Sequence, residues 1–141
     1  MKTYPLDASD YTLIEAAREK IKALYKEDKH HVGAALKTKT GKIVTAVHIE
    51  AYVGRITVCA EAIAIGKAIS EGEKEFETIV AVRHPYSDEI DRDLKVVSPC
   101  GMCRELISDY AEDCLVIIEV DGEAVKTKIS ELLPLKYTRR S

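Results

Sequence analysis

The sequence has no excess of basic residues and no long apolar run. Its 21 Lys and Arg are outnumbered by 24 Asp and Glu, so the formal net charge is −3. A protein that grips a nucleic-acid backbone is therefore disfavoured. The apolar runs are far too short to cross a bilayer, and the opening residues MKTYPLDASDYTL lack the apolar core of a signal peptide. We expect a cytoplasmic protein that binds neither nucleic acid nor membrane.

Repeats, low-complexity tracts and linkers are also missing from the chain. Its length of 141 residues therefore predicts a single domain over residues 1–141. The composition, 46% hydrophobic and 32% charged, is typical of a globular protein rather than a disordered one. The cysteines number only four, and in the cytosol they are more often metal ligands or free thiols than disulfides.

Hydrophobic spacing divides the chain into helices and strands. Helices are predicted at 10–27 with Asp10 as its cap, at 59–70 ending at Gly72, at 100–110, and as one turn at 129–133. Strands are predicted at 32–38, 42–49, 76–83, 114–120 and 124–128, the first two forming a hairpin. The polar stretch 84–97 is expected to be a loop. Strands alternating with helices predict an α/β layered domain.

Three of the cysteines stand at predicted helix starts. Cys100 and Cys103, in SPCGMCRE, are three residues apart and so share one face of a helix. The first turn of a helix offers free N–H groups and a positive dipole, which lower the pKa of a thiol. Cys59 also begins a helix, and two helix N-termini can bring the three thiols together. Three protein ligands with a fourth position open are typical of a catalytic zinc ion.

One carboxylate, Glu61, lies inside the apolar run VCAEAIAI, where burial is costly without compensation. Two residues after Cys59, it is close to the expected metal. It can take a proton from a zinc-bound water, whose pKa falls to about 7 in favourable sites. Three thiolates leave a zinc cluster with net negative charge, which the two helix dipoles and Arg104 are available to offset.

The order CAE followed by PCxxC is the general signature of zinc deaminases, in which the Glu is not a metal ligand. Two alternatives use the same cysteines: a structural zinc site closed by Cys114, as in a non-catalytic zinc module, and a redox CxxC pair. Both leave Glu61 unexplained, and Cys114 begins the apolar run CLVIIEV, which favours core packing. A metal ligand could instead be a histidine, among His30, His31, His48 and His84.

The motifs GAAL, CAE, SPCGMCRE and ELLP occur in the order seen in the small tetrameric cytidine deaminases. The segments DKHHVGAAL, VCAEAIAIG and PLKYTR are more similar still to the blasticidin-S deaminase branch of that family. The resemblance implies a three-layer α/β/α sandwich around a five-stranded mixed sheet, and a homotetramer whose sites share residues between subunits. It implies one Zn²⁺ per subunit and hydrolytic removal of the 4-amino group of a cytosine nucleoside. Blasticidin S is the expected substrate, and cytidine or deoxycytidine of pyrimidine salvage is the alternative.

The resemblance also assigns the metal side of the site. It implies that Cys59, Cys100 and Cys103 are the zinc ligands and that Glu61 is the proton shuttle. Cytidine deaminases usually have C-A-E-R, with the Arg hydrogen-bonded to the thiolates, whereas this chain has Ala62. The blasticidin-S deaminases also lack that Arg. Arg104 and the helix dipoles are then expected to carry more of the charge compensation.

On the substrate side, the Asn-x-Glu motif that holds the ribose hydroxyls corresponds to His48-Ile49-Glu50, so the Glu is kept and the Asn is not. Without the resemblance, Glu50 is equally well a solvated edge charge. His30 stands where the family has a pocket phenylalanine, and Tyr137 matches an aromatic that reaches a neighbouring subunit's site. Blasticidin S carries a sugar carboxylate and lacks the ribose diol, so we hypothesise that His48 supplies a positive charge. The further candidates for that charge are Arg55, Arg83 and His84.

Overall fold

The computed structural model describes residues 1–139; Arg140 and Ser141, which the predicted domain includes, lie outside the described residues. A mixed sheet runs through it in the order β2-β1-β3-β5-β6. The strands β3 and β5 pair in parallel, and the other neighbours along this order pair antiparallel. The five strands are β1 (Val32–Thr38), β2 (Ile43–Val47), β3 (Phe76–Arg83), β5 (Leu115–Val120) and β6 (Glu123–Lys128). The predicted five-stranded mixed sheet is confirmed.

A sixth strand, β4 (Lys95–Val97), corrects the expectation of a loop throughout residues 84–97. The strand β5 is paired with β3 only at Thr78 and Ile79, so it leaves the end of β3 open on that side. The three residues of β4 pair antiparallel with this open end, with Val97 opposite Ala81. The pairing of β4 with β3 therefore depends on where β5 leaves β3 unpaired, which the short stretch Lys95–Val97 does not reveal.

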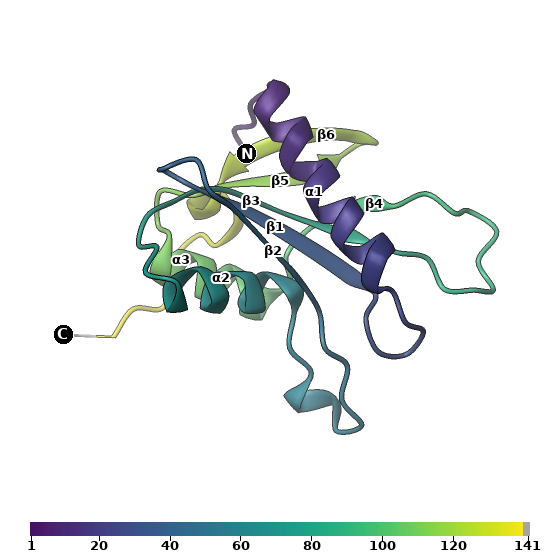
Figure 1. The fold of residues 1–141 in the computed structure, drawn as a ribbon. Coiled ribbons are helices and arrows are strands. Elements are labelled where there is room, and N and C mark those ends of the chain that lie inside the picture. Colours follow the sequence, from purple (N-terminus) through teal and green to yellow (C-terminus); the bar gives the residue numbers. More distant parts are fainter. Residues whose placement is uncertain (140–141) are drawn as a thin grey trace.

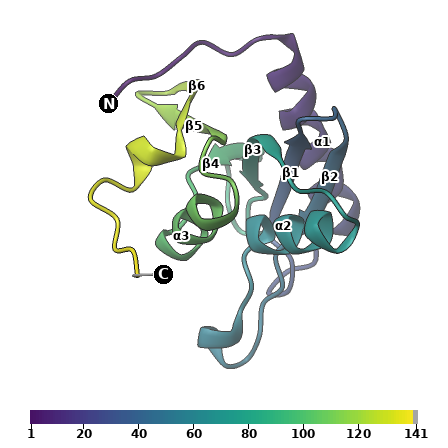
Figure 2. The ribbon, with the colours of Figure 1, turned by 90° about the vertical axis from the view of Figure 1, so that its left-hand side faces the viewer.

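Helices cover both faces of the sheet, which gives the predicted three layers (Figures 1 and 2). The helix α1 (Ala8–Leu24) lies on one face, and α2 (Ala60–Ser70) and α3 (Gly101–Tyr110) lie on the other. Successive strand residues point to opposite faces. Accordingly Ala35 packs in the cluster with α1, while its neighbour Leu36 packs in the cluster with α2 and α3.

The first helix spans Ala8–Leu24 rather than the predicted 10–27, and its N-cap lies three residues before the predicted cap, Asp10. Its N-cap is Asp7, whose Oδ1 accepts a hydrogen bond from the Asp10 backbone N–H at 3.1 Å. The carboxylate of Asp10 in turn accepts from the Asp7 backbone N–H at 2.9 Å, which completes a capping box. Asp10 is buried and also pairs with Lys126 at 2.7 Å. Both acids cap the helix, and Asp10 additionally fastens it to β6.

The helix α1 comes very close to β1 at Gly33. A Cβ atom added there would meet the Ala17 carbonyl oxygen at 2.6 Å and the Ile21 Cβ at 2.9 Å. Glycine therefore sets how near α1 lies to the sheet. The remaining short elements are the 3₁₀ turns η1 (Gly54–Ile56) and η2 (Ile129–Leu132). Within residues 1–139, no helix combines the length and the apolar character needed to cross a membrane.

Candidate zinc and substrate site

Two neighbouring helix N-termini carry the three cysteines. Cys59 is the N-cap of α2, Cys100 is the N-cap of α3, and Cys103 lies in the first turn of α3. The two helices lie side by side on the same face of the sheet (Figure 2). The Sγ atoms of the three cysteines all lie within 4.8 Å of one another, and those of Cys59 and Cys100 are 3.4 Å apart. The convergence predicted from the sequence is present.

This donor set fits a zinc ion. Tetrahedral zinc with Zn–S bonds of about 2.3 Å places its sulfur ligands about 3.7 Å apart, close to the 3.4 Å between Cys59 and Cys100. Within the part of the chain that the structure describes, the candidate metal cluster contains these three cysteines and no fourth ligand. Cys114 is 1% exposed, packs in the hydrophobic core, and its thiol donates to the Leu115 carbonyl. A site closed by Cys114 is thus not what the fold builds.

The three thiols differ in their tendency to ionise. Burial, followed by the hydrogen bond with Cys100, raises the pKa of Cys59, and burial together with the nearby Glu61 charge raises the pKa of Cys103. For Cys100 burial acts in the same direction, but the backbone N–H of Cys103 and hydrogen bonds from the other two thiols bring its pKa below the ordinary value. Three crowded thiolates need a cation to be stable together, which is what a metal ligand set requires.

Glu61 lies beside the cysteines in the first turn of α2, and it is only 6% exposed. Its negative charge acts on both Cys59 and Cys103, which places the carboxylate next to the thiol cluster. Burial raises the pKa of Glu61. A carboxyl group whose pKa is shifted towards neutrality can both accept and give a proton, as general acid–base catalysis requires.

The predicted substrate residues form a second group. The His48 Nε2 is 3.2 Å from the Glu50 Oε1, and His30 Nδ1–H donates to the His48 carbonyl at 2.8 Å. The other Glu50 oxygen accepts from the Thr57 hydroxyl at 3.1 Å. These hydrogen bonds, that of His48 first and Thr57 next, hold the pKa of Glu50 below its usual range. No sequence motif marks Thr57, and only its contact with Glu50 reveals its part in this group.

Two further predicted residues, Arg104 and Tyr137, make no hydrogen bond to the thiols within the described part of the subunit. Arg104 donates from Nε to the Pro99 carbonyl at 2.9 Å and from Nη1 to the Leu132 carbonyl at 3.2 Å, so these hydrogen bonds reach backbone rather than thiolates. It fastens η2 to the start of α3. Tyr137 is 81% exposed in the C-terminal segment, in a hollow beside α3 that Glu105 and Tyr110 also line. Within a single subunit it does not reach the cysteine cluster's own cavity.

The candidates for positive charge are mostly engaged elsewhere. Arg83 forms a bidentate pair with Glu89, and His84 donates to the Pro85 carbonyl while stacking on Tyr25. Arg55 instead lines a mainly apolar cavity of about 370 Å³ beside the cysteines. That cavity is lined by Arg55, Ile56, Thr57, Val58, Cys59, Ala62, Met102, Cys103 and Leu106. Ala62, where cytidine deaminases have an arginine, is thus part of an apolar wall.

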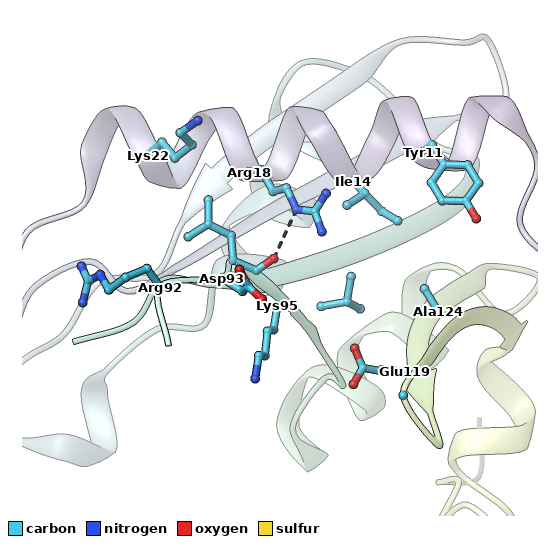
Figure 3. A pocket seen from close by; sticks show the side chains of 12 residues that line it. Tyr11, Ile14, Arg18, Lys22, Arg92, Asp93, Lys95, Glu119 and Ala124 are labelled. Atoms are coloured by element: carbon cyan, nitrogen blue, oxygen red, sulfur yellow. Dashed lines mark hydrogen bonds between the residues drawn. The ribbon is translucent and has the colours of Figure 1, made fainter. Parts of the chain in front are cut away.

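A second hollow, of about 630 Å³, lies on the other side of the sheet between α1 and the edge formed by β4 and the β5–β6 turn (Figure 3). Two of its basic side chains already have partners. Arg18 Nε donates to the Leu94 carbonyl at 3.2 Å, and Lys95 pairs with Asp91 at 2.8 Å. No cysteine lines it, and the sheet separates it from the metal cluster on the α2–α3 face. The chemistry therefore belongs to the α2–α3 face.

Known proteins match this chain over nearly its full length. Residues 7–119 match the family model of the cytidine and deoxycytidylate deaminase zinc-binding region. The chain is 69% identical over 139 residues to the blasticidin-S deaminase of Bacillus cereus, covering 99% of both proteins. It is 39% identical over 103 residues to a probable cytidine deaminase of Dictyostelium discoideum, covering 73% of this chain and 65% of that one.

Solved structures agree on the fold. The cytidine deaminase of Burkholderia pseudomallei is 27% identical with a TM-score of 0.71, covering 90% of this chain and 98% of that one. The cytidine deaminase of Bacillus anthracis gives a TM-score of 0.76 at 21% identity, covering 92% of this chain and 89% of that one. With its thiol cluster, its adjoining carboxylate and these matches, the chain belongs to the cytidine and deoxycytidylate deaminase family of zinc-dependent hydrolytic enzymes.

Proposed function

We propose that this chain removes the 4-amino group of blasticidin S by hydrolysis and so confers resistance to that antibiotic. The observation that carries the proposal is the convergence of three thiols with a buried carboxylate, in a chain 69% identical to the blasticidin-S deaminase of Bacillus cereus. Cys59, Cys100 and Cys103 would hold one zinc ion, and Glu61 would carry protons. The single domain and the cytoplasmic location predicted from the sequence are part of this proposal.

The catalytic role of Glu61 follows from its position. A zinc ion held by the three thiolates would lower the pKa of the water that attacks C4 of the cytosine ring. Glu61 takes a proton from that water and gives one to N3 of the ring. It would then take the proton of the hydroxyl now on C4 and pass it to the departing amine. The C4=O bond forms as the C4–N bond breaks, so that water and the cytosine nucleoside become the uracil nucleoside and ammonia. The raised pKa of Glu61 suits a group that must alternate between both forms.

The substrate-binding part of the proposal uses Glu50 and His30. Glu50 is a carboxylate with a lowered pKa and has accepting positions left for an N–H or O–H donor of the substrate. The His30 ring is held by its bond to the His48 carbonyl and is half-buried, as a ring that lines a pocket should be. Ala62 and the apolar cavity beside Cys59 distinguish this site from one with an arginine at that position.

We also propose a homotetramer in which Tyr137 completes the site of a neighbouring subunit. Large apolar side chains are exposed in the segment before α2, in the first turn of α3 and in the C-terminal segment, and exposed apolar surface of this kind marks protein interfaces. They are Tyr52, Val53, Ile56, Met102, Leu135 and Tyr137. Ile56 and Met102 line the cavity next to Cys59, so a second subunit on this surface would close the site against water.

Cytidine deamination is the second candidate. The 39% identity to a probable cytidine deaminase of Dictyostelium discoideum favours it, and the metal chemistry would be the same. The two are separated by adding zinc-loaded protein to blasticidin S and, separately, to cytidine, and following the ultraviolet absorbance of the cytosine ring. Rapid loss with blasticidin S and little change with cytidine is the expected result. The reverse would make the protein a salvage enzyme, and no change with either, with zinc present, would defeat both.

A further inference from the structure

We propose that His48 is a neutral positioning residue: its ring, anchored on the backbone of β1, donates from Nε2 to Glu50 and aims that carboxylate at the substrate. This rests on the proposed function, because Glu50 is the group expected to meet the sugar. The role replaces the positive charge that the sequence suggested for His48. It makes an imidazole that touches no substrate a determinant of substrate affinity.

The Nδ1 atom of His48 accepts two backbone hydrogen bonds. This atom accepts from the backbone N–H of His31 at 2.8 Å and from that of Val32 at 3.2 Å. A backbone N–H can only donate, so Nδ1 must carry a lone pair and no proton. Adding a proton there would break both hydrogen bonds and leave two N–H groups facing a third. The ring is therefore the neutral form with its proton on Nε2.

The other ring nitrogen of His48, Nε2, lies within hydrogen-bond distance of Glu50. A neutral imidazole has one donor and one acceptor, and the Glu50 Oε1 lies 3.2 Å from Nε2. Both nitrogens of His48 are then engaged within the protein, and the side chain is only 11% exposed. No hydrogen-bonding capacity is left for a substrate carboxylate or hydroxyl. Any effect of His48 on the substrate must pass through Glu50.

Both carboxylate oxygens of Glu50 are held by hydrogen bonds. Its Oε2 accepts from the Thr57 hydroxyl at 3.1 Å, and its backbone N–H donates to the Lys29 carbonyl at 2.9 Å. His48 and Thr57 thus fix the plane of the carboxylate. An ionised carboxylate offers about four accepting positions, so two remain for a ligand. The lowered pKa of Glu50, caused first by His48 and next by Thr57, agrees with a carboxylate that stays ionised.

The anchor itself is rigid. The His31 Nε2 accepts from the Asp28 backbone N–H at 2.9 Å, and the His31 ring packs 4.1 Å from the ring of Tyr86 and edge-on to Tyr25. The His48 backbone N–H donates to the Val32 carbonyl at 2.9 Å, which ties the residue to β1 a second time. A ring fixed at both ends in this way can orient a neighbour with little loss of entropy on binding.

Two substitutions separate the two ends of the ring. In His48→Asn the amide oxygen is as many bonds from Cβ as Nδ1, so it can accept from the backbone, but nothing reaches Glu50. In His48→Gln the amide nitrogen matches Nε2 and can donate to Glu50, but the backbone acceptor is lost. We expect His48→Asn to raise KM for blasticidin S about tenfold with kcat nearly unchanged, as for the loss of a hydrogen bond to a charged group. We expect His48→Gln to keep KM within about threefold of the original protein and to lower Tm instead. An equal increase in KM in both variants would overturn the proposal.

A double-mutant cycle tests whether the effect passes through Glu50. In a Glu50→Ala background, His48→Asn should change KM by less than about twofold, because its target is gone. A further tenfold increase in KM in the Glu50→Ala background would mean that His48 contacts the substrate directly, and would overturn the proposal.

The tautomer is measured without any turnover. Long-range ¹H–¹⁵N correlation spectra of the imidazole rings at pH 7, with His48 assigned by its absence in His48→Asn, should show a proton on Nε2 and none on Nδ1. A proton on Nδ1, or on both nitrogens, would overturn the inference. If the original protein deaminates neither nucleoside, the proposed function fails, yet this spectrum still decides the state of His48.

Discussion

Glu61 is the residue on which turnover should depend most. Glu61→Gln keeps the size of the side chain but cannot exchange protons, so kcat should fall by about 10²- to 10⁴-fold for each proton transfer that is lost. Zinc content should not change, because the carboxylate is not a ligand. Stopped assays with metal analysis of the same sample measure both quantities.

The matched control is Glu71→Gln, at the exposed end of the same helix. Glu71 pairs with Lys42 at the surface, at 2.9 Å, far from the thiols along α2. It should keep full turnover. Normal turnover by Glu61→Gln would refute its role as the proton carrier.

The two kinds of cysteine should separate in metal analysis. Cys100→Ala removes a ligand, so its zinc content should fall well below one ion per chain. Cys114→Ser should keep its zinc, since Cys114 is buried in the core and its thiol donates to a carbonyl that a hydroxyl can also reach. Loss of zinc from both variants would instead support a site closed by four cysteines.

The sequence predicted the positions of short side chains best, because their functional atoms lie close to the backbone. The thiols of Cys59 and Cys100 are fixed by helix N-termini, so knowing where the helices begin was enough to bring them together. The hydrogen-bond partners of Arg104 could not be predicted, because a long guanidinium selects partners within a wide radius. The carbonyls that it binds include that of Leu132, whose place depends on how the C-terminal segment folds back.

At the scale of the element, the start of α1 should respond to pH. The Ser9 hydroxyl and then the Asp10 backbone N–H lower the pKa of Asp7 from 3.8 to about 2. A carboxylate whose pKa is lower in the folded protein contributes stability above its unfolded pKa, and loses it as the pH falls towards the folded pKa. That contribution should therefore be complete above about pH 5 and fade between pH 4 and pH 2.

Asp7→Asn keeps an accepting N-cap oxygen but has no charge. Urea denaturation of both proteins from pH 7 to pH 3 should show the original protein more stable at pH 7, with the difference narrowing below pH 4. A difference that stays constant across this range would show that the charge of Asp7 does not matter.

Helices and long strands were predictable because each carries its own hydrophobic period. The exceptions were short or depended on a distant partner. The strand β4 exists because β5 leaves the end of β3 unpaired, which no local pattern encodes. The N-cap of α1 is Asp7 rather than the predicted Asp10, and the two acids, three residues apart in DASD, belong to one capping box.

At the scale of the whole molecule, the proposed tetramer predicts that two inactivating substitutions in different chains restore each other's activity when the chains assemble together. If Tyr137 acts in a neighbour's site, a chain with Tyr137→Ala still has its own thiols and Glu61, and a chain with Glu61→Gln can still lend its tyrosine. Co-expression of these two weakly active chains should give mixed oligomers whose activity exceeds that of either parent.

The matched control pairs two defects that belong to the same subunit's part of the site. Glu61→Gln and Cys100→Ala each disable the metal side of their own chain, so mixing them repairs no site and activity should stay at the parental level. Recovery in the first pair and none in the second would place Tyr137 across the subunit boundary. Activity at the average of the parents in both pairs would confine each site to one chain, and the exposed aromatic and apolar side chains would then need another partner.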